Sequence, residues 1–388
     1  MNRRTYLAAV CTTGFAGLAG CANRLRNAQR TVEGPCDDPG GTWPTAGGDP
    51  SRTGQADTAP PSPDADVVDL LAGVRDEGQQ RLASSLPAIA DGSAYVPVSG
   101  GVVAVDLNAP GDGPIWSHEL DDDVDGVPAM SCGAVLAPGL NQLTALDPAS
   151  GDRYWQADVG SHGATAVASK GGTVYVAGSN PVAVDARTGE IQWSAEGGDT
   201  LALGSGGLYT TQNINGTGGI FAHDLDGEER WHLSLGKIVG SASVHEGTVR
   251  VADNTGTVYA IDAMTGETYW SRSPEGVGKI HSGLAVHGND VVVPAGGGAK
   301  SVVLDASTGE IRWTADTGIV TGRPVVGDDW VAFGRTNIGV TLYDRSTGEH
   351  RATWTREEHG LGTVDGLAAI EGGFVIRGGT TSGLSLIS

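Results

Sequence analysis

The sequence is poor in basic residues, and lysine in particular is scarce. It has 24 lysines and arginines against 46 aspartates and glutamates, which gives a net charge of -22, and only four of the basic residues are lysine. Such a chain has no basic stripe, which argues against nucleic acid and anionic lipid headgroups as direct partners. Because strong salt screens the self-repulsion of so many carboxylates, the composition indicates haloarchaeal adaptation. An acidic secreted protein from a moderate environment is the alternative.

A long apolar run is also missing. The weakly apolar residues 8–19 are too few for a stable membrane-spanning helix. They follow Arg3 and Arg4, in a pattern typical of a twin-arginine export signal, and they lead into Leu18-Ala19-Gly20-Cys21, which matches a lipobox. The sequence therefore predicts Cys21 as a lipid anchor. A generic cleavable signal with an incidental Cys21 is the alternative.

On this interpretation the chain has three parts. Residues 1–20 are a twin-arginine lipoprotein signal peptide, and residues 21–42, rich in Asn, Arg, Asp, Gly and Pro, are a flexible tether. Residues 43–388 are the folded body. We expect a monomer outside the cytoplasm, attached to the outer face of the cytoplasmic membrane through the lipid alone.

A repeat dominates this body. Between residues 104 and 354 a version of Ala-x-Asp-x-x-Thr-Gly-Glu-x-x-Trp occurs seven times, with successive aspartates 41, 38, 39, 38, 43 and 39 residues apart. Short β-branched and aromatic runs separated by Gly, Asn and Pro fill each unit, which is typical of an antiparallel meander. About four strands in each 40-residue unit predict a β-propeller, because a β-solenoid has shorter periods. The aspartates are Asp106, Asp147, Asp185, Asp224, Asp262, Asp305 and Asp344.

The motif has a mechanical interpretation. Aspartates such as Asp185 can accept hydrogen bonds from turn amides, and glycines such as Gly189 can take a left-handed backbone conformation. Seven copies of one turn are more plausible than seven copies of one metal ligand or catalytic acid.

Residues 183–193 (AVDARTGEIQW) and 260–270 (AIDAMTGETYW) resemble the docking motif of the PQQ-like, quinoprotein-type propeller repeat family. The resemblance covers residues 43–388 and extends to the BamB-like propeller lipoproteins. It implies that each motif indole wedges against the neighbouring blade. These structural docking residues are Trp116, Trp155, Trp193, Trp231, Trp270, Trp313 and Trp354.

The blade count follows from the two ends of the body. After Trp354 the chain holds three strand-like runs and then stops where the next turn would begin. The missing strand is expected from residues 66–71, because pairing them with the C-terminal strands removes two open sheet edges. Residues 43–54 resemble the lead-in segment of secreted family members. We predict an all-β, eight-bladed propeller of four-stranded antiparallel blades, with seven blades as the alternative.

Four cysteines are present. Cys11 lies in the signal and Cys21 is the proposed anchor, which leaves Cys36 and Cys132. A disulfide between these two would pin the tether to the second blade. We favour a small buried thiol at Cys132, because residues 127–136 are expected to form an inner strand.

No catalytic residue is predicted. The nine histidines show no metal-binding spacing and no set of nucleophile, base and orienting group. Asp121, Asp123 and Asp125 lie in a segment that matches the first half of a calcium loop. The twelfth loop position is Cys132 and not Glu, so an acidic inter-blade loop is the favoured interpretation.

Loops that join one blade to the next gather around the channel mouth, and the repeats disagree there. Mixed charges in these loops suit a recognition face, although unconstrained solvated loops are the alternative. The candidate recognition residues are Arg81, Asp125, His162, Asp199, Lys237, His281, Arg323 and Asp365.

Two function classes stay open at this point. The first is a lipid-anchored, non-catalytic scaffold that binds other cell-surface proteins and needs no cofactor. The second is a quinone-dependent enzyme or small-molecule sensor at the channel mouth, for which the family would imply pyrroloquinoline quinone with Ca²⁺. The sequence has no adjacent cysteine pair of the kind many quinoprotein dehydrogenases carry.

Overall fold

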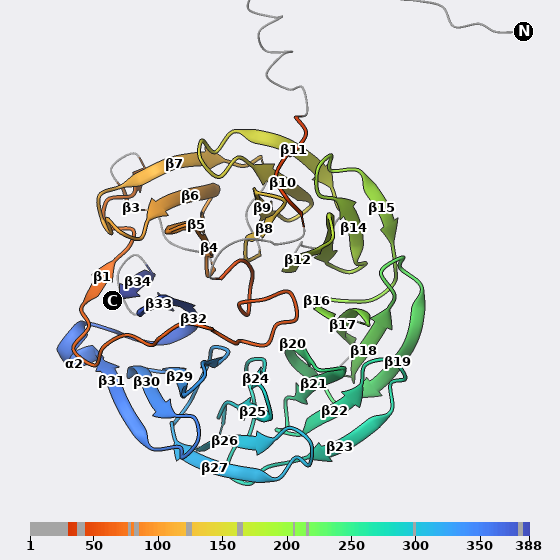
Figure 1. Cartoon of the computed structure of the whole chain (residues 1–388), viewed down its shortest axis with the longest axis vertical. Helices are drawn as coiled ribbons and strands as arrows, with labels where there is room; N and C mark the ends of the chain where they lie inside the picture. Colours follow the sequence, from red (N-terminus) through yellow and green to blue (C-terminus); the bar gives the residue numbers. More distant parts are fainter. Residues whose placement is uncertain are drawn as a thin grey trace, which may run out of the picture.

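The computed structural model describes residues 30–36, 43–76, 79–80, 85–121, 126–160, 166–204, 206–214, 217–297, 300–378 and 383–388. These residues form a ring of eight four-stranded antiparallel sheets around a central axis (Figure 1). The predicted eight-bladed propeller is confirmed.

The strands of blades one to four follow the chain outwards from the axis. Blade one is β4 (Ala88–Ala90), β5 (Ser93–Val98), β6 (Gly101–Asp106) and β7 (Pro114–Glu119), and blade two is β8 (Ala129–Ser131), β9 (Ala134–Pro138), β10 (Gln142–Leu146) and β11 (Arg153–Asp158). Blade three is β12 (Ala166–Lys170), β13 (Thr173–Ala177), β14 (Val182–Asp185) and β15 (Ile191–Ser194), and blade four is β16 (Thr200–Gly204), β17 (Gly207–Ile214), β18 (Thr217–His223) and β19 (Glu229–Leu235).

Blades five to seven repeat this order, and blade eight closes the ring. Blade five is β20 (Ile238–His245), β21 (Thr248–Asp253), β22 (Val258–Asp262) and β23 (Thr268–Arg272), and blade six is β24 (Ala285–His287), β25 (Asp290–Val293), β26 (Lys300–Asp305) and β27 (Ile311–Asp316). Blade seven is β28 (Val325–Val326), β29 (Trp330–Arg335), β30 (Gly339–Asp344) and β31 (His350–Thr355), and blade eight is β32 (Val364–Ile370), β33 (Gly373–Gly378), β34 (Leu384–Ile387) and β1 (Val67–Asp69). Outside the blades lie the pair β2 (Arg75–Asp76) and β3 (Gln79–Gln80) and the short α2 (Arg356–His359).

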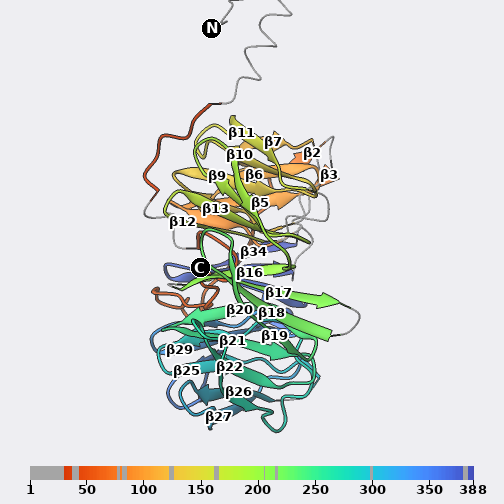
Figure 2. The same ribbon diagram turned by 90° about the vertical axis from the view of Figure 1, so that its right-hand side faces the viewer.

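The two faces of the ring differ in their connections. Because the strands alternate in direction, the turns from first to second and from third to fourth strand share one face, which we call the turn face. The connections from second to third strand and from one blade to the next share the other, which we call the loop face. In Figure 2 residues 30–36 lie on the opposite side of the ring from the end of β17 and the start of β18, which mark the loop face.

Burial explains why these runs become strands. The middle strands are valine-rich and buried along nearly their whole length, as in β13 and β25, because neighbouring blades cover both of their faces. The outermost strands are mostly exposed apart from the motif indole, as in β27. No helix among the described residues is long and apolar enough to cross a membrane.

The motif indoles dock as the resemblance implied. In six blades the Trp Nε1–H donates to a backbone carbonyl in the turn of the next blade, with N···O distances from 2.7 to 3.2 Å. Each of these rings also covers the turn glycine of the next blade, where an added Cβ would lie 2.6 to 2.8 Å from indole carbons. The acceptors, from blade two onward, are Pro148, Ala186, Leu225, Ala263, Ala306 and Arg345.

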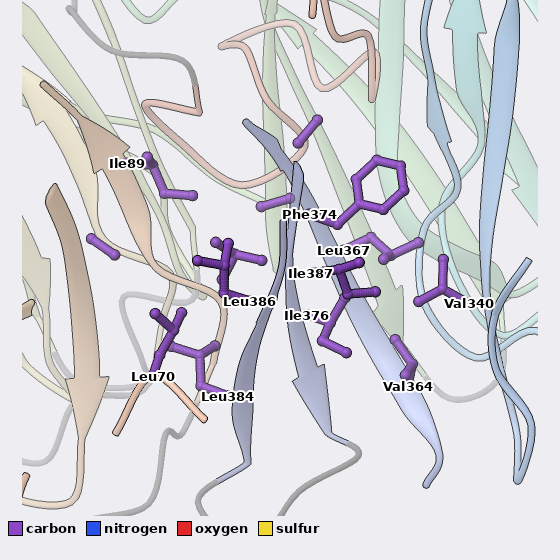
Figure 3. Packing of buried hydrophobic residues seen from close by; sticks show 14 of the residues in the cluster. Leu70, Ile89, Val340, Val364, Leu367, Phe374, Ile376, Leu384, Leu386 and Ile387 are labelled. Atoms are coloured by element: carbon purple, nitrogen blue, oxygen red, sulfur yellow. The ribbon is translucent and has the colours of Figure 1, made fainter. Parts of the chain in front are cut away.

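The last seam of the ring is different because blade eight has no motif turn. Strand β1 pairs antiparallel with β34, with Val68 opposite Leu386, so the N-terminal strand supplies the outer edge of blade eight as predicted. Trp354 packs edge-on against Phe374, at 6.1 Å between ring centroids, and its buried Nε1 has no partner among the described residues. Figure 3 shows Phe374 with Leu367, Ile376 and Ile387 in this large cluster.

Candidate functional site: the central channel and its mouth

The lead-in segment, residues 43–56, runs through the central channel. Along this segment, successive residues bond to the innermost strand of one blade after another, from blade one to blade seven. The backbone pairs, in chain order, are Trp43 with Ile89, Pro44 with Met130, Pro50 with Leu203, Ser51 with Val244, Thr53 with Val286 and Gly54 with Val326, and the Thr45 hydroxyl bonds to the Val167 carbonyl of blade three. This path ties seven blades to one strip of chain.

Two arginines anchor the segment inside the channel. Arg52 is 2% exposed, and its guanidinium donates to the carbonyls of Leu201 (3.2 Å), Val167 (3.0 Å) and Ala46 (2.5 Å). Burial, and then the charge of Arg323, lowers the pKa of Arg52 to about 9. The guanidinium is therefore used to hold blades three and four to the segment.

Arg323 performs the same task on the other side of the channel. Its guanidinium donates to the Leu284 carbonyl (2.6 Å), to the Ser243 hydroxyl (2.8 Å), to Ser241 and to the Arg52 carbonyl. Burial lowers the pKa of Arg323 to about 10. Among the described residues it forms no ion pair within 4 Å, and Asp49, whose own pKa is raised by burial, is the carboxylate that acts on it through space.

A cavity of about 270 Å³ opens beside the lead-in segment, and its lining includes Trp43, Ala46 and Gly47 of that segment. The remaining lining comes from blades one, two, seven and eight. Within it Arg377 pairs with Asp365 at 2.8 Å. The other lining residues are Ser85, Leu86, Val127, Arg323, Pro324, Gly366 and Leu367.

The structure separates the predicted recognition residues into groups. Lys237 and His281 are exposed on the loop face, and Asp199 is exposed there with its carboxylate accepting from the Asn213 amide (3.2 Å). Asp365 and Arg323 line the cavity. The bonds of Arg323 to the channel wall make it a structural residue, which removes it from the recognition face. Arg81, Asp125 and His162 lie outside the described residues.

The candidate calcium loop, for which an acidic inter-blade loop was the favoured interpretation, lies largely outside the described residues, since Asp123 and Asp125 fall there. Asp121 is exposed, and its carboxylate is 3.6 Å from the Arg153 guanidinium. Within the part of the chain that the structure describes, no group of three or more His, Cys, Asp or Glu side chains could hold a metal ion.

Residues 30–36 form a clasp on the turn face of blades two and three. Arg187 donates to the carbonyls of Val32 (2.8 Å) and Gly34 (3.0 Å), and Val32 is buried in the core below. Arg30 lies over the Tyr154 ring and 3.7 Å from Asp152. Val32, Gly34 and Cys36 are therefore held against the ring, within a stretch that was predicted to be part of a flexible tether.

The clasp ends in a disulfide between Cys36 and Cys132. Our preference for a buried free thiol at Cys132 was wrong. Cys132 does not lie within a strand: it has a positive φ of 50° and follows β8 in the hairpin turn, where Cys36 reaches it across the turn face. Cys21, Arg3 and Arg4 lie outside the described residues.

Arg52 and Asp49 were not predicted as channel residues. Residues 43–54 resemble a lead-in segment, but their path could not be predicted, because each of their contacts occurs once and leaves no periodic signal. The only hint was an isolated Asp-Pro-Ser-Arg-Thr-Gly run ahead of the first strand.

A family model described as outer membrane protein assembly factor BamB matches residues 98–212 and 216–383 of the chain. No curated protein matches it. BamB from Moraxella catarrhalis is similar in structure, with a TM-score of 0.59 and 17% identity over 83% of this chain and 97% of that one.

Two further solved structures share the fold. Quinohemoprotein alcohol dehydrogenase ADHIIG from Pseudomonas putida HK5 has a TM-score of 0.66 and 16% identity over 90% of this chain and 80% of that one. The computationally designed Ika8 protein has a TM-score of 0.64 and 16% identity over 81% and 98%. Identities this low show a common fold and carry no statement about activity.

Proposed function

This chain belongs to the family described as outer membrane protein assembly factor BamB, and from that premise we propose that it is a non-catalytic scaffold that binds other proteins at the cell surface. A lipid on Cys21 holds it on the outer face of the cytoplasmic membrane. Its partners meet the loops of the ring, and it works as a monomer.

The observation that carries the proposal is the lead-in segment that runs through the channel. Ligand pockets in ring-shaped folds favour the axis, where many elements converge. Here residues 43–56 lie along the axis and bond to seven blades. The guanidinium groups of Arg52 and Arg323 donate their hydrogen bonds to carbonyls inside the channel. The residues left to meet a partner are those of the exposed loops, where the blades differ.

The disulfide supports the proposed export. Disulfides form and persist outside the cytosol, and Cys36–Cys132 joins residues 96 positions apart in a protein of few cysteines. The clasp also fixes where the chain leaves the ring. From Cys21 to Arg30 there are nine residues, which reach at most about 30 Å, so an anchored propeller stays close to its membrane.

The channel-mouth cavity does not suit pyrroloquinoline quinone, the cofactor that the family resemblance would imply. A flat tricarboxylate needs free cationic groups, and the two described arginines in the lining are already engaged, Arg323 with the channel wall and Arg377 with Asp365. The described lining therefore offers no ready partner for its carboxylates.

The experiment is intact-mass analysis and membrane fractionation of the protein from its native host, with Cys21→Ala as the matched variant. The proposal expects a mature chain that starts at an acylated Cys21 and sediments with membranes, and a variant that is released. Thermal-shift titration with pyrroloquinoline quinone and Ca²⁺ is the second arm. A saturable shift there, or an unmodified soluble wild type, would contradict the proposal.

A further inference from the structure

Three of the four lysines of this acidic chain lie on the loop face of blades five and six. Lys237 is in the β19–β20 loop, Lys279 is in the β23–β24 loop and Lys300 begins β26, and all three are exposed. The fourth, Lys170, ends β12 on the turn face, where its Nζ donates to the Gly204 carbonyl at 3.1 Å. The scarcest charged residue type is thus concentrated on one side of the ring.

Backbone contacts hold Lys279 and Lys300 together. The Lys279 carbonyl accepts from the Gly297 amide at 2.7 Å, and the Lys300 amide donates to the Gly276 carbonyl at 3.2 Å. The Lys300 side chain lies along Gly276, where an added Cβ would be 3.2 Å from the lysine Cδ. The β25–β26 hairpin therefore lies along the β23–β24 loop, with both amines on the same surface.

The β21–β22 hairpin connects Lys237 to this surface. The Asn254 amide donates to the Lys237 carbonyl at 2.8 Å. Two residues further on, Gly256 touches Gly278, because a Cβ there would lie 2.3 Å from the Gly278 carbonyl oxygen, and Gly278 precedes Lys279. Lys237, Lys279 and Lys300 therefore form a continuous strip, which we call the lysine strip, with His281 beside it.

The amines of the lysine strip are free in a protein where carboxylates are abundant. Within the described residues none of the three has a carboxylate oxygen within 4 Å, whereas Arg312, Arg351 and Arg377 each do. The carboxylate of Asp253 is turned toward its own turn. Glu275, next to Gly276, and Asp316, opposite Lys300 in β27, are exposed near Lys300, but neither pairs with its amine within 4 Å. Three exposed lysines on neighbouring loops, without a carboxylate contact in the described part of the chain, are therefore available to an outside carboxylate.

We propose that the lysine strip is the contact site for an acidic segment of a partner protein. At 1 M salt the Debye length is about 3 Å, so distant attraction is screened and only direct amine–carboxylate contacts contribute. Three exposed lysines on contacting loops of one face provide such contacts. The clasp lies on the turn face and the lysine strip on the loop face. A membrane anchor that precedes the clasp in the chain would therefore not cover the strip. This assignment rests on the proposed scaffold function, since it assumes a protein partner.

The first test uses the mature chain and a synthetic oligo-aspartate peptide as the probe. Lys237→Gln, Lys279→Gln and Lys300→Gln together should weaken binding about tenfold, as expected from the loss of three exposed ion pairs. The matched control is Lys170→Gln, which should equal the wild type both in affinity for the peptide and in thermal stability. Equal weakening by Lys170→Gln, or equal binding of an oligo-thymidylate, would show a general polyanion effect and overturn the proposal.

The second test uses native membranes and separates this proposal from the scaffold function. A carbodiimide joins a lysine directly to a carboxylate that it contacts, whereas a long amine-reactive crosslinker records any neighbouring protein. We expect carbodiimide crosslinks from Lys237, Lys279 or Lys300 to Asp or Glu of the partner. Long-arm crosslinks to a partner without these direct ones would refute the lysine strip alone. No crosslinked partner with either reagent would refute the scaffold as well.

Discussion

The indole of Trp155 lies directly over Gly189 of the next blade. A Cβ on Gly189 would come within 2.7 Å of the indole Cε3, and the same indole donates its Nε1–H to the Ala186 carbonyl at 3.0 Å. One glycine thus meets two requirements at once, a positive φ of 76° and room for the ring. The repeated Thr-Gly of the motif is the docking surface for the preceding blade.

Gly189→Ala should destabilise the ring by about 2–4 kcal/mol, because it combines backbone strain with overpacking against Trp155. The matched control is Gly171→Ala, which has φ +58° but nothing within 4 Å of its new Cβ and should cost only about 1 kcal/mol. Denaturant unfolding in high salt measures both. Equal losses of unfolding free energy would show that contact with the Trp155 indole adds nothing to the cost of backbone strain.

Trp155→Phe should cost more than Trp354→Phe. The first change leaves the Ala186 carbonyl unpaired, a penalty of about 1–3 kcal/mol, whereas the Trp354 Nε1 has no described partner to lose. Both indoles are fully buried, so both variants also suffer a similar loss of packing. The difference between their free energies of unfolding isolates the hydrogen bond, and a difference near zero would contradict its role.

Arg323→Met should lower the free energy of unfolding by about 3 kcal/mol or more, because several buried carbonyls and hydroxyls lose their donor. Lys237→Ala with His281→Ala should stay within about 0.5 kcal/mol of the wild type, since both side chains are exposed. Thermal unfolding compares the two. If the Arg323→Met protein is as stable as the double variant, Arg323 has no structural role and is again a candidate recognition residue.

Stability should fall as the pH drops below about 6.5, in part through His287. Its Nδ1 faces the Arg345 guanidinium and its Nε2 lies 3.1 Å from Asp328, with Asp290 on the far side of Arg345 at 3.3 Å. Burial, and then the charge of Arg345, lowers the pKa of His287. The unfolded chain therefore takes up this proton before the folded one does, and stability is complete only above the unfolded pKa.

The check is the urea midpoint at pH values on either side of about 6.5 for the wild type and His287→Gln. The variant should lose less stability across this range, and His281→Gln, at an exposed position, should behave like the wild type. A residual slope is expected from His118 and His223, whose pKa values are also lowered by burial. If the urea midpoint changes equally with pH in the wild type and in His287→Gln, protonation of His287 does not contribute to the loss of stability.

Repetition made the ring predictable from sequence. The spacing of Asp185, Gly189 and Trp193 is kept in four units and varied in three others. The incomplete last unit led to the pairing of residues 66–71 with β34. What could not be predicted occurs only once. The Cys36–Cys132 disulfide and the bonds of Arg52 join positions about 100 residues or more apart, and nothing in the local sequence shows which blade such a segment reaches.

The same reason limited the site. Arg323 was placed in an inter-blade loop correctly, but a loop position does not say whether its guanidinium faces solvent or the channel. That depends on Arg52 and Ser243, which come from the lead-in segment and another blade. The lysine strip likewise appears only once Lys237, Lys279 and Lys300 are brought together by three separate turns.

The most direct test of the scaffold is affinity isolation of the crosslinked protein from native membranes, with mass spectrometry of every crosslinked peptide. The account predicts a defined partner protein, joined mainly through the loop-face residues Lys237, Lys279 and Lys300 and not through Lys170. Isolation of the chain without a crosslinked partner would contradict it, and so would a bound quinone with quinone-dependent turnover.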